Sequence, residues 1–224
     1  MRLRGPHARR VVVLAVSGLL FGLLGPATAA PSWLAPGTIS AANSDAPQVA
    51  VAPDGTTAAT WVTQTGPGVA WVMVSTRAPA GTWSAPVPVS AEGVFPNQPA
   101  IVIDPAGNLT VLWRVLVGND LIQATHRPVG GAWTAPVELS DHAASPPYAD
   151  VDAAGNVVAV WTTVTTHRVV RTRTLFPATG WTAFKDLSDS SQNADDPRVA
   201  VDAAGRATKF VVKTVEGDQV ATRK

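Results

Sequence analysis

A single tyrosine, three glutamates and several arginines are the residues of this chain whose types could together cleave a glycosidic bond. A tyrosine can act as nucleophile, a glutamate can assist it, and clustered arginines can hold a substrate carboxylate. These residues are Tyr148, Glu92, Glu138, Glu216, Arg114, Arg168 and Arg198. No local motif brings them together, so the sequence favours a protein that is not an enzyme and indicates no catalytic residue. Glycoside hydrolysis stays an alternative.

The other residue types that support catalysis or metal binding are sparse. His126, His142 and His167 lack the spacing of metal ligands, and no serine stands in a nucleophile elbow. The chain contains no cysteine, which excludes disulfides, zinc–thiolate sites and thiol catalysis. We therefore expect neither a metal nor a cofactor.

A repeat of about fifty residues positions these side chains. Its four copies contain the motifs Pro47–Gly55, Pro99–Gly107, Pro147–Gly155 and Pro197–Gly205, whose glycines are spaced 52, 48 and 50 residues apart. A tryptophan follows the glycine by six residues in the first three copies. A second tryptophan series has spacings of 50, 50 and 48 and consists of Trp33, Trp83, Trp133 and Trp181. The repeat accounts for seven of the eight tryptophans, and we expect them to lie in the core.

Each repeat predicts four short antiparallel strands, which in the first copy cover residues 48–52, 57–63, 69–76 and 83–89. Between the first two strands lies a tetrapeptide such as Asp104-Pro-Ala-Gly107, whose composition suits a type I turn. We therefore assign Asp104, Asp152 and Asp202 to hairpin turns and not to catalysis. Four short strands per repeat are typical of a propeller blade, so we predict an all-β, four-bladed β-propeller.

The two ends of the repeat region are out of phase with each other. The repeats cover about 47–90, 97–140, 147–188 and 197–224, and the last copy lacks its outer strand. Residues 32–40 have the pattern of such a strand, and we predict that they pair beside 219–224 and close the ring. Two alternatives are a piece of a longer propeller and a half ring that a second copy completes.

Four residues depart from the repeat and are candidate ligand-binding residues. Asp150 is charged where the other copies have the small apolar residues Ala50, Val102 and Ala200. Lys209 is charged where the other copies have Ala59, Val111 and Ala159. Tyr148 and Arg198 are the bulky variants at one further position. Buried charges must be paired or hydrated. We therefore predict that Asp150, with Lys209 or Arg198, lines a central channel or forms an ion pair between blades, and a purely structural pair is the alternative.

The loops between blades and those that join second to third strands emerge on one face, because successive strands alternate in direction. Acidic residues outnumber basic ones there, and Asp141, His142, Asp195 and Asp196 are its candidate ligand-binding residues. Loops on a rigid scaffold commonly carry binding residues. A negative loop face suits a cation, a basic peptide or a sugar held by Asp and Asn side chains.

Residues 1–30 have the features of a secretory signal peptide: four arginines, an apolar run over 11–24 and the small-residue site Ala27-Thr28-Ala29. We expect cleavage there, a β-propeller domain over 31–224, and a secreted protein without stable membrane insertion. The whole chain has 17 basic and 16 acidic residues, and loss of four arginines leaves a net charge of −3. This balance argues against nucleic acid as a partner.

The repeat resembles those of secreted bacterial β-propeller proteins of the sialidase-like, or BNR-repeat, type. The resemblance covers residues 32–224 and rests on the recurrent Trp and Ser, on Pro-x-Val-x-Val-Asp at 197–202 and on Gly-Asn at 107–108 and 155–156. It implies a propeller and a glycan-directed role. Our hypothesis is a non-catalytic extracellular binding or interaction module. The alternatives are a sialidase-like glycoside hydrolase or lectin, and a structural scaffold or fragment of a larger propeller.

Overall fold

The computed structural model describes residues 35–91, 95–116, 118–143, 145–214 and 218–223, with side chains up to residue 209. The predicted signal peptide, Glu92, Glu216 and Trp33 lie outside the described residues. Residues Thr38–Lys224 form one compact unit. All regular elements in the described ranges are strands, and none is a helix that could span a membrane, so the prediction of an all-β fold is confirmed.

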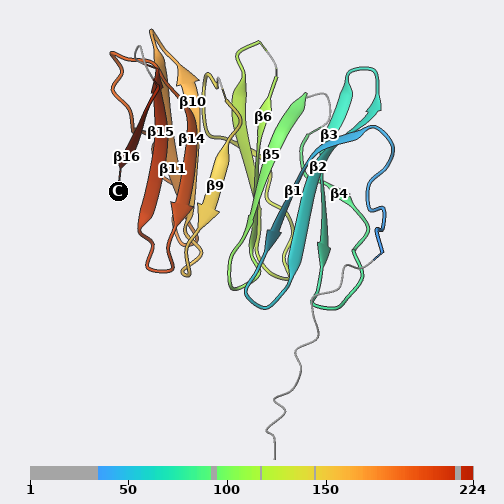
Figure 1. Ribbon diagram of the computed structural model, residues 1–224. Coiled ribbons are helices and arrows are strands. Elements are labelled where there is room, and N and C mark those ends of the chain that lie inside the picture. Colours follow the sequence, from blue (N-terminus) through green and yellow to red (C-terminus); the bar gives the residue numbers. More distant parts are fainter. Residues whose placement is uncertain (1–34, 92–94, 117, 144, 215–217, 224) are drawn as a thin grey trace, which may run out of the picture. The chain divides into compact units, whose positions relative to one another are not determined.

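The strands form four antiparallel sheets, each of which follows chain order (Figure 1). The first sheet contains β1 (Ser44–Val51), β2 (Thr57–Gly66), β3 (Val69–Arg77) and β4 (Val87–Pro88). The second contains β5 (Pro96–Ile103), β6 (Leu109–Val115), β7 (Leu121–Arg127) and β8 (Val137–Glu138). The third contains β9 (Tyr148–Val151), β10 (Val157–Val164), β11 (Arg168–Phe176), β12 (Gly180–Trp181) and β13 (Lys185–Asp186). The fourth contains β14 (Ala194–Val201), β15 (Ala207–Thr214) and β16 (Asp218–Arg223).

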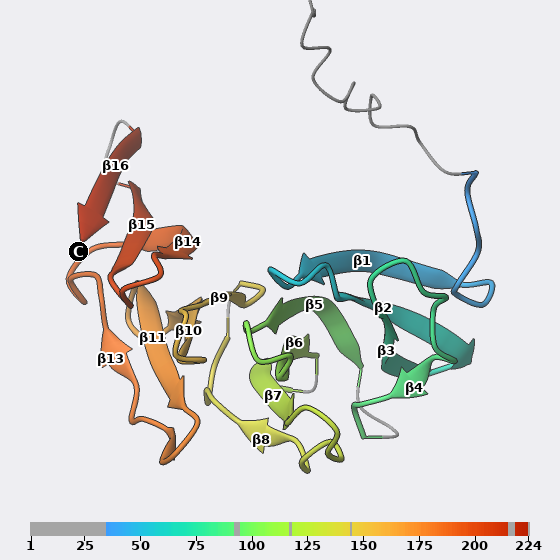
Figure 2. The ribbon, with the colours of Figure 1, turned by 90° about the horizontal axis from the view of Figure 1, so that it is seen from below.

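The sheets pack on one another in chain order, along an arc that Figure 2 shows from below. β5 packs against β1, β2 and β3, β9 packs against β5, and β14 packs against β9, β10 and β11. The first strand of each sheet, β1, β5, β9 or β14, therefore lies on the inner side of the arc, as the sequence predicts.

The alternation of apolar residues explains why the sheets stack. Ile101, Ile103 and Trp113 of the second sheet pack against Val72 and Val74 of the first. The equivalent Trp161 of the third sheet packs against the second sheet, and both Trp113 and Trp161 are fully buried. Full burial of such an apolar side chain stabilises the fold by about 2 kcal/mol or more. For this tryptophan series the predicted core position is therefore correct.

The hairpin turns have the predicted chemistry. The Asp104 carboxylate accepts hydrogen bonds from the backbone amides of Ala106 and Asn108, both at 2.9 Å. Asp152 accepts the corresponding pair from Ala154 and Asn156. These aspartates build turns, and their carboxylates already have partners.

The outer strands are shorter than expected. In the first sheet only Val87–Pro88 forms a strand, with a separate bridge between Arg77 and Trp83. Pro86 and Pro88 lack the amide proton that a longer ladder needs, which explains the interruption. Trp83 is half-buried and lies 5.3 Å from the Arg77 guanidinium, so it covers a sheet edge and not the core centre.

The predicted closure by an N-terminal strand is not found in the described part of the chain. Residues 35–40 form no strand, and β16 pairs only with β15. Ile39 and Ser40 instead line a hollow with Thr60 and Trp61 of the first sheet. Pro36 and Gly37 interrupt the extended pattern within 35–40, and residues 32–34 of the predicted strand lie outside the described residues.

Candidate binding site on the inner strands

A backbone bulge interrupts the beginning of three of the four inner strands. The pairing register shifts between Asp45 and Gln48 in β1, and at the equivalent places in β5 and β14. The residue in each bulge has a positive φ, which is 51° at Ala46, 47° at Gln98 and 48° at Asp196. Each precedes a proline that has no amide proton to continue the ladder. Bulges redirect side chains and gather beside functional sites.

The bulges of β1 and β5 border a hollow of about 260 Å³ at the start of β1, β5 and β9. Its polar side chains are Gln48, Gln98 and Tyr148, and the remainder of its lining consists of Ala46, Pro99, Ala100, Pro146 and Pro147. Two amides can donate and accept hydrogen bonds, and the phenol ring adds a flat apolar surface. We call this feature the amide hollow.

Tyr148 and Arg198, which the sequence singles out, lie together. The Arg198 guanidinium carbon is 3.9 Å from the centre of the Tyr148 ring, and the guanidinium donates a hydrogen bond of 2.8 Å to the Pro197 carbonyl. The cation stabilises the ring in place through its π electrons. This contact joins β9 to β14 and fixes the aromatic wall of the amide hollow.

Asp150 joins the same two strands, but not through the predicted ion pair. Its Oδ2 accepts a hydrogen bond of 2.7 Å from the Val201 amide, and its Oδ1 accepts one of 2.9 Å from the Val151 amide. No described contact links it to Lys209 or Arg198, so the predicted partners are wrong. The backbone amides take their place because a charged oxygen is strongly stabilised by N–H donors.

A second hollow of about 560 Å³ lies farther along the inner strands. Asp150 lines it together with mostly apolar residues that include Val102 and Val151. Both Asp150 oxygens already accept hydrogen bonds from backbone amides.

Lys209 does not face the inner hollows. It lies on β15, and its pKa is lowered by burial and further by the nearby charge of Lys185 on β13. The described residues therefore place this lysine between the third and fourth sheets, away from Asp150, and it has no role in the candidate site.

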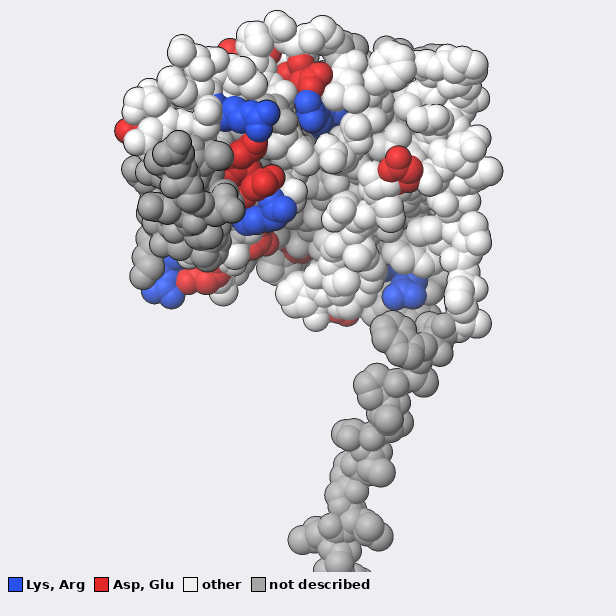
Figure 3. Space-filling view, turned by 45° about the horizontal axis from the view of Figure 1, so that its top comes forward, with Lys and Arg blue, Asp and Glu red and all other residues white. Residues whose placement is uncertain are grey.

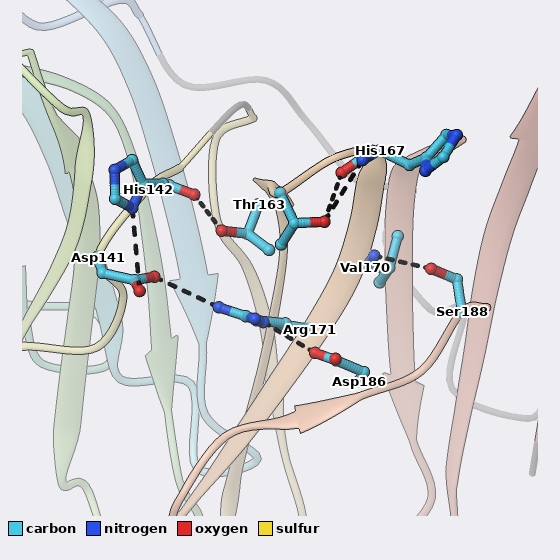
Figure 4. Close-up of polar contacts among 9 residues, drawn as sticks. Asp141, His142, Thr163, His167, Val170, Arg171, Asp186 and Ser188 are labelled. Atoms are coloured by element: carbon cyan, nitrogen blue, oxygen red, sulfur yellow. Dashed lines mark hydrogen bonds and ion pairs between the residues drawn. The ribbon is translucent and has the colours of Figure 1, made fainter. Parts of the chain in front are cut away.

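Asp141 and His142 belong to a network on the loop face (Figure 4). Arg171 bridges two carboxylates, at 3.3 Å from Asp141 and 2.8 Å from Asp186. The Asp141 carboxylate also lies 3.8 Å from His142 Nδ1. The His142 carbonyl accepts a hydrogen bond from Thr163. The network connects the end of the second sheet to the third, so Asp141 contributes to packing between sheets.

Asp195 and Asp196 lie at the bulge of β14, where Asp195 contacts Arg168 and accepts a hydrogen bond of 2.9 Å from Thr162. Asp120 likewise contacts Arg114. Figure 3 shows acidic and basic side chains next to one another over the third and fourth sheets, and few charges over the first. Three aspartates of the loop face, Asp120, Asp141 and Asp195, thus pair with arginines.

The residues that could form a hydrolytic site do not lie together in the described part of the chain. Glu138 is exposed on the outer strand β8. Arg114 and Arg168 are engaged by aspartates, so they do not converge with Arg198 into a carboxylate-binding cluster. In the same ranges no three acidic or histidine side chains are grouped as metal ligands.

Sequence reasoning missed Gln48 and Gln98, because glutamine in a repeat with variable residues carries no distinctive signal. The available signal was the dipeptide X-Pro at the same place in each copy. A residue before proline normally avoids helical and left-handed conformations, so a bulge there was not expected.

No family model and no curated protein sequence matches this chain. Similar solved structures include the Hadza microbial sialidase Hz136, with a TM-score of 0.55, 12% identity and 81% of this chain covered. A protein of unknown function from Dyadobacter fermentans has a TM-score of 0.55 at 12% identity over 80% of the chain. An α-L-arabinanase from Penicillium chrysogenum in complex with arabinobiose gives 0.53, at 12% identity over 80%.

This chain spans 44% of the sialidase, 65% of the Dyadobacter protein and 61% of the arabinanase. At such low identity the likeness concerns the fold alone. The chain has a β-propeller, sialidase-like fold, in agreement with the predicted fold type.

Proposed function

We propose that this protein is a non-catalytic, carbohydrate-binding module of the cell exterior, with its ligand in the amide hollow. In this proposal the four sheets are the blades of a propeller-type domain, with repeats of the sialidase-like kind. The observation that carries the proposal is the convergence of Gln48, Gln98 and Tyr148 at the starts of three neighbouring inner strands, two of which, β1 and β5, are bulged.

The chemistry of the amide hollow suits a sugar. Glutamine amides pair with hydroxyl groups as both donors and acceptors, and an aromatic ring packs against the apolar face of a sugar ring. The hollow, at about 260 Å³, is close to the lower limit of small-molecule sites, which is about 300 Å³. It has room for a single ring-sized unit, such as the end or a branch of a glycan.

The surroundings of Tyr148 support binding over catalysis. Its ring is stacked on Arg198, and the described glutamate, Glu138, lies on an outer strand. A tyrosine nucleophile needs a base within hydrogen-bond reach to take its proton. The similar solved structures include a sialidase and an arabinanase, which agrees with a carbohydrate ligand, and hydrolysis is the second candidate function that the test must separate.

Residues 1–30 support export, because a basic start, an apolar run and a small-residue site follow one another. An extracellular location would give the module access to cell-surface or environmental glycans. Detection of the protein in culture medium, with a new N-terminus near Ala30, tests this part of the proposal.

A glycan array, run together with a panel of chromogenic glycosides, tests the function. We expect binding to a subset of glycans and no hydrolysis. Q98A and Y148A should abolish binding, whereas Q64A, which changes an exposed glutamine outside the hollow, should leave it intact. Q98A is expected to fold, because the equivalent position in the first repeat is already an alanine, Ala46, with the same backbone conformation.

Two results would contradict the proposal. Binding that survives in both Q98A and Y148A would place the ligand elsewhere. Hydrolysis that disappears in Y148F, which retains the ring and removes only the hydroxyl, would make the protein an enzyme.

A further inference from the structure

The first sheet exposes an apolar face that its equivalents bury. Val49 and Val51 on β1 are 64% and 62% exposed. The repeat-equivalent residues of the second sheet, Ile101 and Ile103, are 8% and 6% exposed, because they pack against the preceding sheet. Among the described residues no other sheet packs on this side of β1, so its valines face outward.

The same face extends across β2 and β3. In the strand register Val49 lies opposite Ala59, Trp61 lies opposite Met73, and Trp71 lies opposite Thr63, so these side chains share one side of the sheet. Trp71 is the one tryptophan that the repeat does not explain. We define the leading face by Val49, Val51, Trp71 and Met73. The last two line an apolar hollow of about 350 Å³ together with Ala41 and with Trp61, which is itself buried at 4% exposure.

On the opposite surface of the fourth sheet, no described strand of another sheet packs. Its residues Ala200, Asp202 and Thr208 line a hollow of about 690 Å³ and define the trailing face. Their equivalents in the first sheet, Ala50, Ala52 and Ala58, pack against the second sheet. The trailing face thus corresponds to surfaces that receive a neighbouring sheet elsewhere in this chain.

The hairpin turns show the same difference between surfaces that the next sheet covers and a surface that is exposed. The carboxylates of Asp104 and Asp152 are buried beneath Gly155 and Gly205 of the next sheet, where an added Cβ would come within 2.7 and 2.9 Å of an aspartate oxygen. The equivalent Asp202 ends the series, and its side chain is 41% exposed. One uncovered turn and two uncovered faces therefore lie where a further sheet would continue the stack.

We propose that a second copy of this chain covers these surfaces, with the leading face of each copy on the trailing face of the other. The repeat indicates this partner. Within the chain, the surface of a sheet that is equivalent to the trailing face packs against the surface of the next sheet that is equivalent to the leading face. Two such contacts around a two-fold axis make a closed assembly and leave no apolar face open. The contact would continue the established packing between sheets.

Light scattering after size exclusion tests the proposal on the full chain. We expect twice the mass of one chain for the wild type, and about half of that mass for V49K/V51K and for T208R. V129K is the matched control, since Val129 is 65% exposed outside both faces and its substitution should leave the mass unchanged. Circular dichroism shows whether each variant is folded.

Mixing the two monomeric variants is the decisive step. V49K/V51K retains an intact trailing face and T208R retains an intact leading face, so together they should form a one-to-one complex, while each alone stays monomeric. A monomeric wild type, or a mixture that stays monomeric, overturns the proposal. A monomeric wild type that melts at a higher temperature than V49K/V51K would show that the chain covers its own leading face, which also overturns it.

Discussion

The Oδ2 atom of Asp150 accepts a hydrogen bond of 2.7 Å from the backbone amide of Val201, fifty-one residues away and in the next sheet. Tyr148 and Arg198 make the adjacent contact between the same two strands. The residues that break the repeat in β9 and β14 thus hold these strands together on the inner side of the arc.

Replacement of Asp150 by alanine should destabilise the protein. D150A removes the acceptor for the Val201 and Val151 amides, and loss of a hydrogen bond to a charged group costs about 1.5–3 kcal/mol. D150N retains one acceptor oxygen and should cost less. Chemical denaturation of both variants measures the difference, and a D150A protein as stable as the wild type would show that this contact is unimportant.

Gly155 lies where the turn of the third sheet covers Asp104. It has a φ of +82°, and an added Cβ would come within 2.7 Å of Asp104 Oδ2. We expect G155A to lower the free energy of unfolding by about 3 kcal/mol, from backbone strain and overpacking together. Gly180 has the same φ with nothing within 4 Å of an added Cβ, so G180A should cost only about 1 kcal/mol. Equal losses in thermal denaturation would refute the proposed close contact.

The stability of the protein should fall on mild acidification because of His126. Burial lowers the pKa of this histidine, and the smaller opposing effect of the Asp104 charge does not restore it; its Nδ1 lies 3.0 Å from Thr110 Oγ1. The folded state therefore favours the neutral ring. The contribution of His126 to the stability of the fold is complete above the pKa of histidine in the unfolded chain, which is about 6.5. It is lost as pH falls below that pKa, because the unfolded chain takes up the proton more readily.

The measurement is the free energy of unfolding as a function of pH, from neutral pH to below the pKa of histidine in the unfolded chain. H126Q should reduce the slope of this free energy against pH, since glutamine does not titrate in that range. A wild-type slope retained in H126Q would assign the pH dependence to other groups.

The repeat made much of the fold predictable. Turn residues such as Asp104 and buried residues such as Trp113 recur at fixed spacing, and their burial and hydrogen bonds follow from local chemistry. The closing strand was not predictable in this way, because pairing of a terminal segment depends on the distance that the arc leaves between its ends. Pro86 and Pro88 also shortened an outer strand for which the alternating pattern alone gave no warning.

The candidate site was predictable only in part. Tyr148 and Arg198 were both singled out as departures from the repeat, but the contact between them was not predicted. The partner of Asp150 was not, because a backbone amide has no sequence signal. Arginines such as Arg171 lie on strands yet reach loop carboxylates such as Asp141, and a count of charges by loop alone does not include these partners.

The affinity of a glycan selected from the array for wild-type protein, Q98A and Q64A, measured by isothermal titration calorimetry, tests the binding role most directly. Loss of the Gln98 amide should weaken binding by at least about tenfold, as expected for a hydrogen bond to a bound ligand worth about 1.4 kcal/mol. Q64A should bind as the wild type does. Equal affinities for all three proteins would contradict a carbohydrate site in the amide hollow.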